Sequence, residues 1–165
     1  MNTTNFKPSP YGGVGGGPLL LPRGLRNNNP LNIIRNGTKW QGMCDTQTDK
    51  HFVQFKTLAY GYRAAFLLIR TYMRKYGLLS IEQIIRRWAP PSENNTAAYI
   101  RTVSEMSGIK RDAMLHWQNE AEMIALVQAM AYVENGRIVM GDSIREGYRM
   151  VGPLPTSPLR GGEGG

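Results

Sequence analysis

Three consecutive asparagines followed by a proline, Asn27 to Pro30, restrict what this part of the chain can form. Asparagine side chains compete with the backbone for hydrogen bonds, and the residue before a proline is pushed out of the α region. The stretch therefore predicts an ordered polar turn that leads into a short strand, Leu31 to Ile34. A second short strand, Phe52 to Phe55, can pair with it, because Asn36-Gly37 between them is a strong turn signal. The pattern predicts one short β-hairpin.

Two interpretations of this polar hairpin are open. In the first, the asparagine side chains satisfy the backbone of their own loop. In the second, the amides and a nearby tryptophan form a rim for a hydroxyl-rich ligand such as a sugar chain, because an amide both donates and accepts hydrogen bonds. The candidate substrate-binding residues of this rim are Asn27, Asn28, Asn29, Asn32 and Trp40.

Glycine-rich sequence at both ends divides the chain into three parts. The stretch Tyr11 to Pro18 has five glycines among its eight residues, and Gly161 to Gly165 has four among five. Such sequence buries too little apolar surface to offset the entropy lost on ordering it. We therefore expect disordered tails at 1–22 and 152–165, and a single globular domain at 23–151.

The chain is basic, with a formal net charge of +8, which predicts an anionic partner. Peptidoglycan or another anionic cell-wall polymer, anionic lipid and nucleic acid all fit this charge. Nucleic acid is less favoured, because the sequence has no zinc-finger spacing and no recognition helix with a flanking basic arm. We expect no membrane span, since no stretch is long and apolar enough.

The sequence gives no sign of an export signal, because Leu19 to Leu21 is too short for the apolar region of a signal peptide. We therefore expect synthesis in a bacterial cytoplasm and action at the cell wall or in a virion only after delivery there. Cys44 is the single cysteine, and His51 and His116 are the two histidines. No disulfide, metal centre or cofactor is predicted. The motifs of serine hydrolases and of phosphate-binding loops are missing as well.

Apolar residues at helical spacing begin near Leu58 and continue through most of the remaining chain. They predict helices from about Leu58 to Gly77, from Ser80 to Trp88, from Asn95 or Thr96 to Gly108, from Asn119 to Asn135, and from Ser143 to Val151. Ser80 and Gln83 form a capping-box pattern at the start of the second helix. The stretch from Ile109 to Gln118 is ambiguous between a turn and a short helix. The fold class is therefore α+β and mainly α.

The loop 89–96 is the second distinctive polar stretch. Pro90-Pro91 stiffens it, and Asn95 or Thr96 can cap the helix that follows. Glu93 is either an ordinary exposed acid near a helix N-terminus or a group that holds a substrate amine or amide. Glu93 and the adjacent Asn94 are further candidate substrate-binding residues.

Glu134 is the candidate catalytic acid. It follows Met130 by four residues and Val127 by seven, so it lies on the apolar face of the last long helix, at its C-terminal end. Partial burial and the negative end of the helix dipole both disfavour a charged carboxylate and raise its pKa. A carboxyl group that stays protonated near neutral pH can protonate a glycosidic oxygen. A glutamate at the edge of the core, bonded to a neighbouring loop, is the structural alternative.

No second carboxylate has diagnostic spacing. The remaining candidates for such a role are Asp45, Asp49, Glu105 and Asp142. With one placed acid, a lytic transglycosylase remains open, because there the sugar's own hydroxyl attacks. An inverting mechanism would need a water molecule positioned by other side chains.

Several motifs together resemble a family of small phage and prophage proteins that are usually described as virion structural proteins. The motifs are Arg23-Gly24-Leu25-Arg26-Asn27-Asn28-Asn29-Pro30-Leu31-Asn32-Ile33, Trp40-x-Gly42, Phe52-x-x-Phe55, Gly61-x-Arg63-Ala64 and Trp88-Ala89-Pro90-Pro91-Ser92-Glu93-Asn94-Asn95-Thr96-x-x-Tyr99. The resemblance covers about Arg23 to Val151. Leu31 stands where that family more often has glycine. A non-catalytic virion or assembly protein, with other virion proteins as partners, is what this resemblance implies.

A weaker resemblance concerns the hairpin region of bacterial glucosaminidases with a lysozyme-like fold. It rests on Asn28-Asn29-Pro30-Leu31-Asn32-Ile33, Trp40-x-Gly42 and Phe52-x-x-Phe55, followed by a long helix. In those enzymes the catalytic glutamate ends a helix before the hairpin, whereas Glu134-Asn135-Gly136 lies after it. A circularly permuted lysozyme-like helical domain would reconcile the two orders and bring Glu134 against the asparagine loop. This resemblance implies cleavage of peptidoglycan glycan strands by a glycosidase or lytic transglycosylase.

Overall fold

The computed structural model describes residues 20–153. The tails predicted at 1–22 and 152–165 therefore lie largely outside the described residues. Within the described part, the Pro22 carbonyl accepts the first hydrogen bond of helix α1 from the Arg26 amide at 3.0 Å. The folded chain can thus be followed from just before α1.

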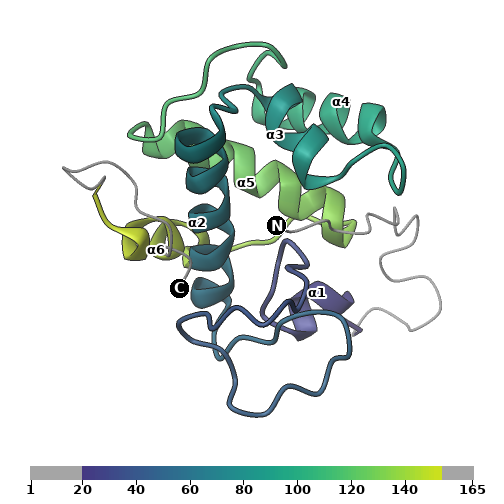
Figure 1. The fold of residues 1–165 in the computed structure, drawn as a ribbon, viewed down its shortest axis with the longest axis vertical. Helices are drawn as coiled ribbons and strands as arrows, with labels where there is room; N and C mark the ends of the chain where they lie inside the picture. Colours follow the sequence, from purple (N-terminus) through teal and green to yellow (C-terminus); the bar gives the residue numbers. More distant parts are fainter. Residues whose placement is uncertain (1–19, 154–165) are drawn as a thin grey trace.

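Six helices form within residues 20–153, and they arrange the chain around α2 and α5 (Figure 1). Their bounds are α1 Arg23–Arg26, α2 Leu58–Tyr76, α3 Ile81–Trp88, α4 Thr96–Ser107, α5 Glu120–Asn135 and α6 Ser143–Val151. Helix α6 packs along α2, and α4 packs on both α3 and α5. Figure 1 shows α3 and α4 together at one end of the molecule and the segment 27–57 at the other. The mainly α prediction is confirmed.

The helix ends follow the predicted capping residues. Ser80 accepts a hydrogen bond from the Gln83 amide at 3.2 Å, and Asn95 and Asn119 cap α4 and α5 in the same way. Gly77, Gly108 and Gly136 follow their helices in the left-handed conformation. The ambiguous stretch 109–118 forms turns rather than a helix, and Leu115 and Trp117 within it are buried.

The predicted hairpin is reduced to two isolated bridges. Ile34 pairs with Phe52 and Met43 with Phe55, both antiparallel, and residues 20–153 contain no longer strand. Side-chain amides join the two segments beside these bridges. Asn29 Nδ2 donates to the carbonyls of residues 33 and 53, while its Oδ1 accepts from the residue 33 amide. The segment is therefore held by asparagine side chains as much as by strand pairing.

Candidate active site

Glu134 ends helix α5 in a buried pocket of hydrogen-bond donors. Asn32 Nδ2 donates to its Oε1 at 3.0 Å, and the Tyr99 hydroxyl donates to its Oε2 at 2.9 Å. Trp88 Nε1 lies 3.4 Å from the same Oε2. Glu134 is only 8% exposed. Three segments that are distant in sequence therefore converge on one carboxyl group.

The pKa of Glu134 is raised from 4.5 to about 7. Burial is the main cause, because it disfavours the charged form. The hydrogen bonds from Asn32, Tyr99 and Trp88 act in the opposite direction, since they stabilise the carboxylate. Desolvation outweighs these three donors, so the carboxyl exchanges its proton near neutral pH. The raised pKa that was predicted from helix position agrees with this environment.

One backbone conformation and one side-chain hydrogen bond place Asn32 against Glu134. Asn32 has a positive φ of 52°, a conformation that asparagine tolerates better than most residues. The neighbouring Asn135 donates from Nδ2 to the Pro30 carbonyl at 2.7 Å, which ties the end of α5 to the asparagine turn. The contact between Asn32 and Glu134 therefore rests on the backbone conformation of Asn32 and on the hydrogen bond of Asn135, which follows Glu134 in α5.

Gly24 in α1 fits into the space beside these two amides. A Cβ atom at Gly24 would lie 2.7 Å from Oδ1 of both Asn32 and Asn135. Neither oxygen has a hydrogen-bond partner among the described residues. A side chain at this position would push Asn32 away from Glu134. Gly24 is thus a positioning residue that lets α1 approach the site.

The other predicted asparagines serve the loop itself. Asn27 donates to Asp49 Oδ2 at 2.9 Å, and Asn28 donates to the Phe55 carbonyl at 3.1 Å. Asn29 is fully buried and bonds to backbone groups, as described above. These contacts match the structural interpretation of the turn. Of the four predicted asparagines of this turn, Asn32 is the one that bonds to Glu134.

Trp40, Glu93 and Asn94 do not bond to Glu134 in the described structure. Trp40 is 7% exposed and lines a separate cavity of about 570 Å³ within the segment 27–57. Glu93 is exposed, and Asn94 Nδ2 donates to the Pro90 carbonyl at 2.9 Å. The residues that reach Glu134 lie on either side of the loop 89–96. Trp88 ends α3 just before the loop, and Tyr99 lies in α4 just after it.

Trp88 and Tyr99 are the site residues that sequence reasoning missed. Their apolar spacing assigned them to the core, and both are indeed buried. Spacing gives the face of a helix but does not show which group a buried indole N–H or phenol hydroxyl will bond. Two signals could have found them. Both residues belong to the same motif, Trp88 to Tyr99, and a buried indole N–H or phenol hydroxyl needs a hydrogen-bond partner.

None of the other candidate carboxylates bonds to Glu134 or its three donors. Asp49 accepts two hydrogen bonds from Arg23, at 2.7 and 2.8 Å. Arg23 is the main cause that holds the pKa of Asp49 well below its usual range. Asp45 and Asp142 have side chains that are 96% exposed, and Glu105 is exposed on α4. Asp49 is therefore a structural ion-pair partner that fixes α1 to the loop before Phe52.

A comparison with known proteins identifies the family. The chain is 45% identical over 130 residues to Protein P5 of Pseudoalteromonas phage PM2, which covers 76% of this chain and 79% of that protein. The chain belongs to the Protein P5 family of phage proteins. No family model matches it. The prediction of a phage protein is confirmed by this relative.

The described residues contain no group of three or more His, Cys, Asp or Glu side chains that could hold a metal ion. Among the same residues, no helix is long and apolar enough to cross a membrane.

Proposed function

We propose that this phage protein cleaves the glycan strands of peptidoglycan, with Glu134 as the general acid. The observation that carries the proposal is a buried carboxyl group with a pKa of about 7 at the meeting point of both polar motifs. Near that pH about half of the molecules hold the proton, and the conjugate base can take a proton back. Such a group suits acid–base work on a glycosidic bond.

In the proposed reaction, Glu134 gives its proton to the glycosidic oxygen while the bond from that oxygen to the anomeric carbon breaks. A hydroxyl of the same sugar or a water molecule then attacks the anomeric carbon, and Glu134 takes up the proton that it releases. No second carboxylate is bonded to the site in the described residues, which favours attack by the sugar hydroxyl, as in a lytic transglycosylase. Hydrolysis by a positioned water is the other route.

The site also suggests how the sugar approaches. Asn32 is half-buried, whereas Trp88 and Tyr99 are fully buried behind the carboxyl group. We therefore place the sugar on the Asn32 side of Glu134. The protein would meet its substrate at the cell wall, after delivery in a virion or by lysis.

A non-catalytic virion structural or assembly protein is the second candidate. One observation favours it: three donors within the fold already bond to the Glu134 carboxyl group. A glutamate of that kind can hold α3, α4 and α5 to the asparagine turn without any substrate. Other virion proteins would then be the partners.

The experiment measures loss of turbidity of purified Gram-negative sacculi by the wild-type protein and by Glu134→Gln. Glu105→Gln is the matched control, because Glu105 is an exposed acid on α4. Clearance by the wild type and the control, but not by Glu134→Gln, supports the general acid. Thermal unfolding of each variant separates loss of function from loss of folding. An inert wild-type protein that is folded would refute the catalytic proposal.

A further inference from the structure

The cavity beside Trp40, which we call the Trp40 cavity, has the size of a small-molecule site. Its volume is about 570 Å³, and pockets that hold small ligands have roughly 300–1,000 Å³. Its lining comes from residues between 35 and 47 and from Val53, and none of these residues bonds to Glu134. The Trp40 cavity is therefore a second concave site, separate from the candidate active site.

Contacts within the fold fix the wall of this cavity. Gly42 has a positive φ of 79°, and a Cβ atom there would overlap the ring of Tyr60. The motif Trp40-x-Gly42 can therefore pack against the start of α2 only with glycine at its third position. Gln47 Nε2 donates to two backbone carbonyls, at 2.8 and 2.9 Å. The lining is thus held in place by the protein itself.

Several hydrogen-bond donors of the lining have no partner within the described fold. Trp40 donates from its backbone N–H to Met43 Sδ at 3.1 Å, whereas its indole N–H makes no hydrogen bond within residues 20–153. Asn36 Oδ1 accepts from the Thr38 amide at 3.2 Å, but the Asn36 side-chain nitrogen and the Thr38 hydroxyl have no partner among these residues. Three neutral donors on one lining suit a ligand with several hydroxyl or carbonyl oxygens.

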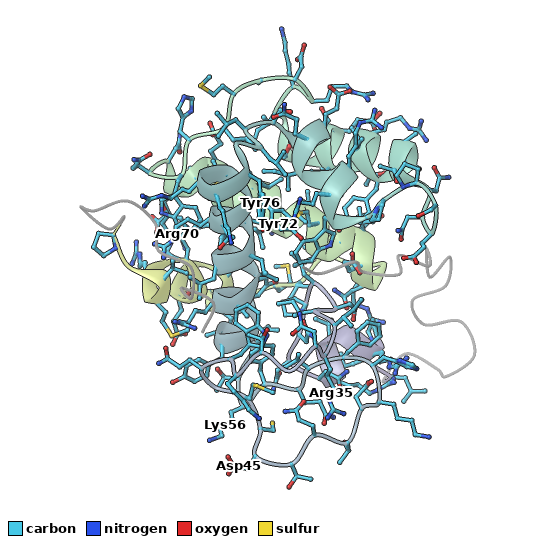
Figure 2. All side chains as sticks on the ribbon, viewed as in Figure 1. Arg35, Asp45, Lys56, Arg70, Tyr72 and Tyr76 are labelled. Carbon is cyan, nitrogen blue, oxygen red and sulfur yellow. The ribbon has the colours of Figure 1, made fainter. Side chains whose placement is uncertain are left out.

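The lining also carries positive charge. Arg35 donates to a backbone carbonyl at 2.7 Å, and neither Arg35 nor Lys39 forms an ion pair within residues 20–153. Asp45 is the acid of the lining, but its side chain is 96% exposed and lies 3.9 Å from Lys56. Figure 2 shows Asp45 and Lys56 at the outer edge of the segment, apart from Arg35. The cavity therefore favours a ligand with a negative group.

We propose that the Trp40 cavity binds a sugar that carries a carboxylate group. The neutral donors bond to hydroxyl and carbonyl oxygens of the sugar, and Arg35 and Lys39 attract the carboxylate. Trp40 is 7% exposed, so its ring faces are largely covered and offer no stacking platform for a nucleic-acid base. A nucleotide therefore fits the cavity less well than an acidic sugar does. This site does not depend on cleavage by Glu134 and is compatible with both candidate functions.

The test titrates the full chain with N-acetylmuramic acid and with its amide, in which a neutral group replaces the carboxylate. The indole N–H signal of Trp40 is followed by NMR, because Trp40 lines the cavity, and the Trp40→Phe variant identifies that signal. The signals of Trp88 and Trp117 serve as internal references. We expect the acid to move the Trp40 signal, and the amide to bind about fivefold more weakly, as for the loss of an exposed ion pair.

Two substitutions in the lining test the assigned contacts. Lys39→Gln removes a charge, and Thr38→Val removes a hydroxyl while nearly keeping the shape of the side chain. Each should weaken binding of the acid about fivefold. Lys50→Gln is the matched control, because Lys50 is an exposed lysine of the same segment that does not line the cavity, and it should leave binding unchanged.

Four results overturn the inference: a Trp40 signal that stays in place, equal binding of the acid and its amide, equal binding of acetate, or tighter binding of a nucleoside monophosphate at the same signal. A Trp88 signal that moves while the Trp40 signal stays in place also overturns it, because the sugar is then bound at Glu134, as the proposed function expects. Movement of the Trp40 signal in a protein that does not clear sacculi supports the inference and refutes the proposed catalysis alone.

Discussion

Glu134 should make the stability of the protein decrease as the pH rises. Its pKa is raised to about 7 in the folded protein, against an ordinary value of 4.5. The folded state therefore binds the proton more tightly than the unfolded chain does between these two values. The stabilising effect is complete below about pH 4.5 and is lost as the pH passes the folded pKa. The difference corresponds to roughly 3 kcal/mol, at about 1.4 kcal/mol for each pH unit.

The assay is urea unfolding of the wild type and of Glu134→Gln at about pH 5 and about pH 8. All other titrating groups are shared, so the difference between the two proteins isolates Glu134. Asp49 does not interfere, because its lowered pKa means that its contribution is lost only under more acidic conditions. We expect the free energy of unfolding of the wild type to fall by roughly 3 kcal/mol more than that of the variant over this range.

One result would refute the reasoning. If the free energies of unfolding of the two proteins change in parallel with pH, Glu134 has an ordinary pKa in the folded state. Burial would then not outweigh its three donors, and the physical basis for a general acid at this position would be gone. Fluorescence of the three tryptophans, Trp40, Trp88 and Trp117, follows the unfolding transition in both proteins, because all three are buried in the folded state.

Two further substitutions test the geometry around the carboxyl group. Tyr99→Phe removes a donor that stabilises the carboxylate, so the pKa of Glu134 should rise further. The pH at which sacculus clearance falls off on the alkaline side, or the midpoint of the carboxyl titration followed by NMR, should move up by roughly one pH unit. Gly24→Ala places a methyl group within 2.7 Å of the Asn32 amide oxygen. We therefore expect destabilisation by about 1–3 kcal/mol in urea unfolding and slower clearance of sacculi. Unchanged values for both would contradict the packing of Gly24 against Asn32.

The helical part of the fold could be predicted from the sequence because its signals are local. A four-residue spacing of apolar side chains defines one face, and capping residues such as Ser80, Asn119 and Gly136 mark the ends. The strands could not be predicted in the same way. Ile34 and Phe52 pair only as an isolated bridge, and the side chain of Asn29, which bonds to the carbonyls of Ile33 and Val53, joins the two segments beside it.

The candidate site was predictable only in part for a similar reason. The position of Glu134 on α5 gave its burial and the direction of its pKa. Motif order led to the expectation that it meets the asparagine turn, and Asn32 does contact it across 102 residues of sequence. Local sequence could not show which asparagine of the turn bonds to Glu134, because this depends on what surrounds each side chain in the folded chain. The partners Trp88 and Tyr99 likewise depend on how helices pack.

The energetics of Glu134 differ from those expected of a carboxylate that only holds the fold together. A carboxylate kept for structure alone is expected to gain from three donors and to have a lowered pKa, as Asp49 does with Arg23. At Glu134 burial exceeds that gain, so its ionisation destabilises the folded state at neutral pH. An apolar side chain or a neutral amide would avoid this cost. A fold that keeps a carboxyl group in this position, with its proton exchangeable near pH 7, has the property that acid–base catalysis requires.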